Sequence, residues 1–201
     1  KAVIVAAGGF GANKEMRALH DPRMANLTTT NHVGATGDLI PLLVDIGADL
    51  TGMDHIQCNP GCPPGRTHRV PIHQGGRFII VGKDGRRFIR EDERRDVIRD
   101  AVLAQPNATA WGVLDQTRFD MINQGQKEAA YKGLETGDCW KANTIEELAK
   151  KMGVDPTISG SSILVMETGD KNLDGLIAGV EKGILVTGFN GGNNNSSTGD
   201  F

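Results

Sequence analysis

The order of apolar and polar residues along the chain predicts a mixture of buried strands and amphipathic helices. Residues 1–7 form an almost unbroken apolar run rich in Val and Ile, which is typical of a strand buried on both faces of a parallel sheet. Shorter segments of extended or strand-like composition follow at residues 48–53, 56–57, 77–81, 87–89, 110–114, 162–166 and 184–187. Lys83-Asp84-Gly85 predicts a hairpin turn between the segments at residues 77–81 and 87–89.

Helical periodicity predicts helices over residues 13–19, 39–46, 92–103, 144–151 and 173–182. Gly47 is placed to end the second helix, and Gly153 to end the fourth. Thr144 and Glu147 have the spacing of a capping box at the start of the fourth helix. The alternation of strands and helices predicts an α/β chain.

Two segments interrupt these patterns. Residues 58–65 contain three prolines and two glycines, which predicts a loop. Residues 191–199 are a low-complexity run of Gly, Asn and Ser, which predicts a mobile segment or a turn.

Composition and charge narrow the class of protein. The chain has 201 residues, enough for one ordinary domain, with a net charge of −3 and 27 glycines. No apolar run approaches the ~18 residues of a membrane span, and the acidic balance argues against a general nucleic-acid binder. Three cysteines are too few for a disulfide scaffold, and their odd number favours a reducing compartment, the cytoplasm rather than the periplasm. Because the chain starts inside an apolar strand pattern, we expect it to be an internal fragment.

The glycines after the first strand have two interpretations. Gly9-Phe10-Gly11 matches the first half of the G-x-G-x-x-G fingerprint, but Lys14 occupies the place of the third glycine. A tight turn explains these glycines by itself. Alternatively, the absence of Cβ atoms lets the backbone approach a phosphate or a flat ring closely.

A zinc site is a second candidate. Its four ligands would be Cys58, Cys62, His68 and His73. The five residues between the two pairs are far fewer than the ~12–15 that separate the pairs in a zinc finger. The sequence therefore predicts a loop with unrelated thiols and imidazoles, and no metal site.

Charged residues are concentrated between residues 86 and 96. The arginines in this cluster are Arg86, Arg87, Arg90, Arg94 and Arg95, and they alternate with acidic residues. The simplest interpretation is a solvated helix face with i,i+4 ion pairs. The sharper hypothesis is that a buried Arg serves as an acid or an anion clamp. Because Arg holds its proton strongly, it serves as an acid only in a relay that returns the proton at once.

Five segments in one order carry a family resemblance. They are KAVIVAAGGFGANKEM, TNHVGATGD, GADLTGMDHIQ, GGRFIIVGKDGRRFIREDERRD and TIEELAKKMGVDP. Together they resemble the FAD-dependent flavoprotein family of fumarate reductase, succinate dehydrogenase and flavocytochrome c, over about residues 1–156. The resemblance implies a partial FAD-binding domain in residues 1–39, an α+β capping domain in residues 40–156, and FAD as cofactor.

The same resemblance implies roles for particular residues. The residues it places beside the flavin are Gly8, Gly9, Thr36, Gly37 and Asp38. In such enzymes the flavin passes hydride to an activated C=C bond, and an Arg of the cap, matched here by Arg95, supplies the proton. Asn59 stands where fumarate reducers have a substrate-binding His, while Pro71 and Gln74 stand at the positions of their proton relay. We therefore expect a small enoyl or unsaturated-acid substrate other than fumarate.

The end of the chain resembles a different family. Residues 159–201, and GILVTGFNGGNNNSSTGDF in particular, are similar to the carboxy-terminal domain of the TldD/PmbA proteins, proposed metalloproteases. The His-Glu-x-x-x-His zinc helix of that family is absent from the sequence. We therefore treat residues 157–201 as a short unrelated β/α segment, joined at a chimeric junction. Three hypotheses remain: part of an FAD oxidoreductase, a metallopeptidase-related protein, and an inactive truncated chain. The sequence does not indicate the oligomeric state.

Overall fold

The computed structural model describes residues 3–58, 61–63, 65–66 and 78–155, together with the backbone of residues 184–190 and 193–194. The helices are α1 (Lys14–His20), α2 (Leu39–Asp45), α3 (Arg95–Leu103), α4 (Gln116–Met121), α5 (Gln124–Thr136) and α6 (Ile145–Met152), with 3₁₀ turns η1 (Pro22–Met24) and η3 (Pro106–Ala108). The strands are β1 (Thr28–Thr29), β2 (Ile79–Val81), β3 (Thr109–Asp115), β4 (Cys139–Ala142), β5 (Ile184–Asn190) and β6 (Asn193–Asn194). Helices and strands are thus mixed, as the sequence predicts.

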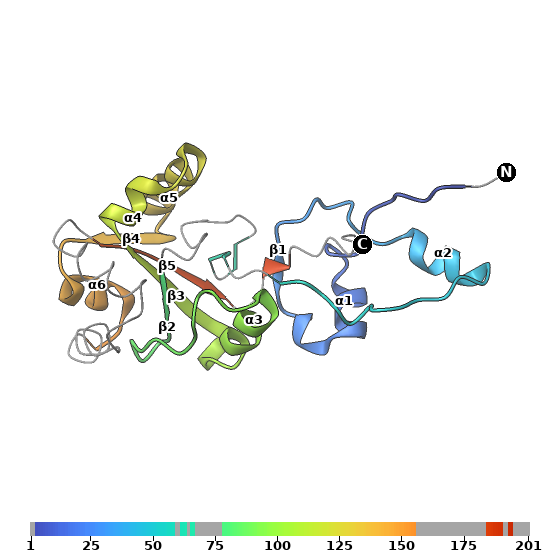
Figure 1. Ribbon diagram of the computed structural model, residues 1–201, viewed down its shortest axis with the longest axis horizontal. Helices are drawn as coiled ribbons and strands as arrows, with labels where there is room; N and C mark the ends of the chain where they lie inside the picture. The colour runs from blue at the N-terminus through green and yellow to red at the C-terminus, as the bar shows by residue number, and fades with distance from the viewer. Residues whose placement is uncertain are drawn as a thin grey trace.

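A four-stranded antiparallel sheet, in the order β2-β3-β5-β4, lies at one end of the molecule, and α1 and α2 lie at the other (Figure 1). β5 comes from the part of the chain with the second resemblance, yet it is an inner strand of this sheet. Val186 is in register with Val113 of β3 on one side and with Trp140 of β4 on the other. The predicted strand at 184–187 is confirmed and continues to Asn190.

Both faces of the sheet are covered, because alternate residues of a strand point to opposite faces. Phe78 and Ile80 belong to a core with residues of α3, α4 and α5, whereas Ile79 and Val81 belong to a core with residues of α6. The sheet and these helices therefore form an α+β unit.

A third core lies outside the sheet. It consists of the buried residues Phe10, Met24, Leu27, Ile56 and Cys58, with partly buried neighbours that include Leu103 of α3. Since Ile98 and Val102 of α3 pack in the core of the sheet, α3 connects the two parts of the molecule.

The predicted helix ends are largely confirmed. The Asn13 side chain accepts a hydrogen bond from the Met16 amide at the start of α1. Thr144 caps α6 by accepting from the Glu147 amide at 3.2 Å, and Gly153 ends that helix in the left-handed conformation. Gly47 follows α2 with a φ of +96°, which favours glycine at this position.

One helix begins later than predicted. α3 starts at Arg95 rather than at residue 92, because Arg94 has an extended ψ of 148°. The Asp92 carboxylate accepts from Arg90 in the turn before the helix, at 2.8 Å. Asp92, which was predicted to be helical, therefore forms a local ion pair in the turn before the helix.

Several predicted strands are wrong. Residues 3–7 form no strand: a strand buried on both faces needs neighbours, and none of the described strands pairs with them. Residues 48–53 and 56–57 are irregular with a turn at residues 53–54, and residues 87–89 make only the single bridge between Arg87 and Val81. Within the predicted mobile segment, β6 pairs in parallel with β1.

The sequence patterns predict no element where α4, α5 and β4 lie, between residues 116 and 142. The predicted strand at 162–166 and helix at 173–182 lie outside the described residues. None of the described helices combines the length and the apolar character that crossing a membrane requires.

Candidate functional site

The two glycine-containing turns that were predicted to lie beside a cofactor are neighbours in space. The Ala12 amide donates to the Ala35 carbonyl at 2.8 Å, and the Asn13 side-chain amide donates to the Thr36 carbonyl at 2.9 Å. These bonds hold residues 8–13 against residues 34–38. We call residues 8–38, which contain both turns, the flavin-side segment.

The two turns differ in how open they are. Gly8 has a φ of +79°, and a Cβ atom added there would meet nothing within 4 Å. At Gly37, with a φ of +70°, an added Cβ would lie 2.7 Å from the Phe10 Cβ. The first turn therefore leaves open backbone that a phosphate or a ring can approach, whereas the second is filled by this protein's own core.

Polar groups beside these turns are available to a ligand. Asp38 is exposed at the start of α2, and its side chain makes no capping hydrogen bond. Thr36 is half-buried, and its hydroxyl donates to the Gly34 carbonyl at 3.4 Å. The open turn at Gly8 therefore fits a flat or phosphate-bearing cofactor, with the Thr36 hydroxyl and Asp38 carboxylate on the adjoining turn.

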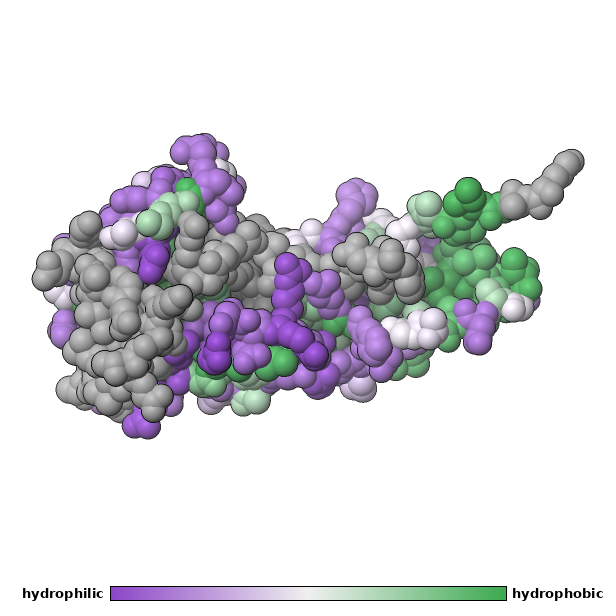
Figure 2. Space-filling model, in the orientation of Figure 1, coloured by the Kyte–Doolittle hydropathy of each residue, from purple (hydrophilic) through white to green (hydrophobic). Residues whose placement is uncertain are grey.

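An apolar surface adjoins this segment. Figure 2 shows it at the end of the molecule that carries α2 and the first described residues. Val3 and Ile4 are 88% and 92% exposed, and Leu42 and Ile46 of α2 are also largely exposed. Contiguous exposed apolar side chains mark a surface that another element or partner covers.

The charge cluster contains a buried arginine, but it is not the one that sequence analysis favoured. Arg87 contacts Glu91 at 2.6 Å with both side chains almost fully buried, and Glu91 also accepts from the Ile80 amide at 2.7 Å. This ion pair fixes the loop after β2 to the sheet. The i,i+4 interpretation holds for this pair, and the closer-spaced pairs Arg90–Asp92 and Arg94–Asp96 were not predicted.

Arg95 and Arg94 differ although they are adjacent. Arg95 is the first residue of α3 and is exposed, and among the described residues its side chain has no hydrogen-bond or ion-pair partner. Arg94 binds Asp96 through two hydrogen bonds, and this carboxylate raises the pKa of the Arg94 guanidinium above its usual range. Of the two, Arg95 has the guanidinium that is available to an external group.

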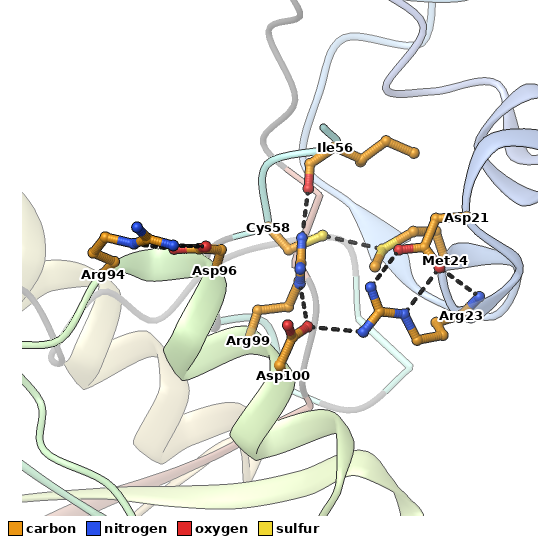
Figure 3. Close-up of polar contacts among 9 residues, drawn as sticks. All are labelled: Asp21, Arg23, Met24, Ile56, Cys58, Arg94, Asp96, Arg99 and Asp100. Atoms are coloured by element: carbon orange, nitrogen blue, oxygen red, sulfur yellow. Dashed lines mark hydrogen bonds and ion pairs between the residues drawn. The ribbon is translucent and has the colours of Figure 1, made fainter. Parts of the chain in front are cut away.

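A chain of ion pairs joins the flavin-side segment to α3 (Figure 3). Asp21 accepts from the Arg23 side chain at 3.0 and 2.8 Å, and Arg23 also donates to Asp100 of α3 at 2.9 Å. The same Asp100 oxygen accepts from Arg99 at 2.8 Å, and Arg99 donates to the Ile56 carbonyl at 2.9 Å. The side-chain hydrogen bond from Arg23 lowers the pKa of Asp21, and that from Arg99 lowers the pKa of Asp100.

A buried thiol lies beside this chain. Cys58 contacts the Met24 sulfur at 3.3 Å, and burial raises the pKa of its thiol to about 11. The buried Arg17 side chain donates to the carbonyls of Met24 and Leu27. Burial lowers the pKa of the Arg17 guanidinium. Cys58 is therefore a neutral core residue at neutral pH.

The remaining candidates are the predicted substrate and proton-relay positions, the zinc hypothesis and one cavity. Asn59, Pro71, Gln74, His68 and His73 lie outside the described residues. The part of the chain that the structure describes contains no group of three or more potential metal ligands. A cavity of about 390 Å³ lies beside Trp111 and Trp140 on the sheet, away from the glycine turns. Its charged groups, Arg66 and Asp138, pair with each other at 3.1 Å.

Comparison with known proteins gives two family matches. Residues 1–157 match the model of the FAD binding domain, and residues 130–201 match that of the PmbA/TldA metallopeptidase C-terminal domain. A probable fumarate reductase, Ifc3, of Shewanella frigidimarina is 37% identical over 157 residues, covering 77% of this chain and 26% of the relative. A urocanate reductase of Eggerthella lenta is 35% identical over 164 residues, covering 77% of this chain and 27% of the relative.

The fold has a solved counterpart. The open conformation of a flavocytochrome c3 fumarate reductase is 29% identical, with a TM-score of 0.67, over 94% of this chain and 34% of that chain. The fold and the first family match together define an FAD-binding flavoprotein. The chain belongs to the FAD-dependent fumarate reductase family, whose cofactor is FAD, and it spans about a quarter of the length of the two curated relatives.

Proposed function

We propose that this chain is part of an oxidoreductase that uses FAD to reduce, or in reverse to form, a C=C bond next to an electron-withdrawing group. The observation that carries the proposal is the match of residues 1–157 to the FAD binding domain, together with relatives named as reductases of fumarate and urocanate. The substrate class is a small unsaturated acid or enoyl compound. A cytoplasmic location stays a prediction.

The flavin-side segment would hold the cofactor. The open backbone at Gly8, with Gly9 next to it, would accept close approach, and Thr36 and Asp38 provide a hydroxyl and a carboxylate for hydrogen bonds. Gly37 serves packing, because Phe10 fills the space that a side chain would need. When bound, FAD supplies the hydride for one carbon of the C=C bond.

Arg95 supplies the proton for the other carbon. Its guanidinium is exposed at the start of α3 and has no carboxylate partner among the described residues. Arg94 is the poorer donor because Asp96 stabilises its charged form. The reaction is balanced when Arg95 regains a proton from solvent after each turnover, since a neutral guanidine is strongly basic.

Three variants of the complete flavoenzyme that carries this chain test the role of Arg95. Arg95→Ala should lower kcat at least about 100-fold with FAD still bound, as expected for loss of a general acid. Arg95→Lys keeps the charge but loses the planar fork, and should recover only part of the rate. Arg94→Ala is the matched control and should keep a near-normal rate. A normal rate in Arg95→Ala with full FAD content would overturn the assignment.

The second family match supports a metallopeptidase-related alternative. Its model covers residues 130–201 and extends back into the region that the flavoprotein match also covers. Zinc and flavin analysis of the purified protein decides between the two. Stoichiometric zinc without flavin would favour the alternative.

A further inference from the structure

We propose that Asp100 is a positioning residue, whose carboxylate ties α3, and Arg95 with it, to the flavin-side segment through Arg23. This inference rests on the proposed function, because it gives Arg95 a reason to be held at a fixed place. The two partners are 77 residues apart in the chain and meet at 2.9 Å (Figure 3).

The Arg23 side chain in this contact is itself held in place. Arg23 binds both carboxylate oxygens of Asp21, and Asp21 also accepts from the Arg23 amide at 3.0 Å. Asp21 is buried at the start of η1, so this anchor belongs to the folded body of the flavin-side segment. A guanidinium fixed in this way presents its remaining nitrogen to Asp100 with less loss of freedom.

On α3, the Asp100 carboxylate contacts two arginines. The oxygen that accepts from Arg23 also accepts from Arg99, and Arg99 reaches the Ile56 carbonyl. The contacts therefore connect α3 to η1 and to the chain just before Cys58. Asp100 is five residues after Arg95 in the same helix, so a shift of α3 at Asp100 moves Arg95 as well.

Apolar packing alone leaves the direction of the helix less defined. Leu103, the last residue of α3, packs in the third core, whereas Ile98 and Val102 pack against the sheet. Beside the Arg99–Ile56 contact, the Arg23–Asp100 contact adds a polar attachment of α3 to the flavin-side segment, closer to Arg95 than Leu103 is. A helix that is attached at more than one point along its length has a fixed orientation, whereas a helix attached at a single point can rotate about it.

The exposure of the pair sets the size of the expected effect. The Arg23 and Asp100 side chains are 52% and 48% exposed. Pairs of this kind stabilise a structure weakly, which corresponds to at most about a fivefold shift in a two-state equilibrium. The Arg23–Asp100 contact is therefore expected to bias the placement of α3, and the protein is expected to fold without it.

The activity test compares single and double variants of the complete flavoenzyme that carries this chain. Asp100→Asn and Arg23→Gln should each lower kcat by about two- to fivefold, with KM little changed, because the donor is misplaced in part of the molecules. The double variant should be no slower than the slower single variant, as expected for residues that act through one contact. Asp92→Asn, which removes an exposed pair within the loop before α3, is the matched control and should keep kcat unchanged.

Hydrogen exchange gives a second readout that needs no turnover. In the 201-residue chain, Asp100→Asn should speed amide exchange in both α3 and η1, and Asp92→Asn should leave both unchanged. Unchanged kcat in Asp100→Asn, losses that multiply in the double variant, or unchanged exchange would each overturn the proposal. The proposed function fails separately, if Arg95→Ala turns over normally.

Discussion

Trp111 of β3 and Trp140 of β4 meet edge to face, with their ring centroids 5.2 Å apart and their planes at 74°. Their strands are not neighbours, because β5 lies between them. Gly188 of β5 is in register with Trp111, and Val186, two residues earlier in β5, is in register with Trp140. Paired residues of antiparallel strands share a face of the sheet, so a side chain at 188 would lie beside Trp111 on the face that carries this ring contact.

Gly188→Val should therefore destabilise the protein. Forcing the two rings apart overpacks a tight contact, at a typical cost of about 1–3 kcal/mol in the free energy of unfolding. The chain has only two tryptophans, so its near-ultraviolet circular dichroism reports this pair directly.

The control for this variant is Gly125→Ala in α5, where an added Cβ makes ordinary contact at 3.6 Å with the Asn123 side chain. Its stability should stay the same or rise, since Ala favours a helix over Gly. If Gly188→Val left both the denaturation midpoint and the tryptophan signal unchanged, β5 would not lie between β3 and β4.

The Asp21–Arg23 pair predicts a loss of stability in acid. The pKa of Asp21 is lower in the folded protein than its ordinary value of 3.8, chiefly because Arg23 donates to the carboxylate. A depressed pKa contributes stability above the unfolded value, and that contribution is lost as the pH falls through the folded value. The free energy of unfolding should therefore fall below about pH 4.

Asp21→Asn tests this contribution. At pH 7 the variant should lose about 1 kcal/mol in the free energy of unfolding, an amount limited by the exposure of Arg23. The difference between the variant and the wild type should shrink in acid, because the wild-type carboxylate is then protonated. Urea denaturation at pH 7, 4 and 3 measures this, and a difference that does not depend on pH would contradict it.

FAD should bind weakly, or not at all, to the 201-residue chain. Gly8 and Asp38 are exposed, and Arg95 has no described contact with either glycine turn. A partly assembled site lacks the preorganisation that tight binding needs. A fluorescence titration with FAD measures the affinity, and tight stoichiometric binding would show that these residues form a complete site.

Local sequence signals predicted the parts of the fold that depend on neighbouring residues. Gly47, Thr144 and Gly153 indicated helix ends correctly, because caps depend on residues within one turn. The run at residues 1–7 indicated a buried strand, but burial depends on strands elsewhere, and none of the described ones pairs with it. The inner position of β5 could not be predicted, because strand pairing between distant segments leaves no local pattern.

The candidate site also combines positions that the sequence indicated with contacts that it could not indicate. Gly8 and Gly37 were singled out by the family resemblance, and both have the left-handed backbone that favours glycine. The burial of Arg87 rather than Arg95 was missed, although Glu91 four residues later was a signal for it. The contact of Arg23 with Asp100 spans 77 residues and has no sequence signal.

The proposed function makes these residues part of an FAD enzyme that reduces activated C=C bonds. The most direct measurement is anaerobic reoxidation of the chemically reduced flavin in the complete enzyme, with fumarate, urocanate, acrylate and larger enoyl acids as oxidants. We predict that one unsaturated acid reoxidises the flavin and yields one equivalent of its saturated product, and that Arg95→Ala slows this step. If none of these acids reoxidises a fully loaded flavin that oxygen still reoxidises, the claim is contradicted.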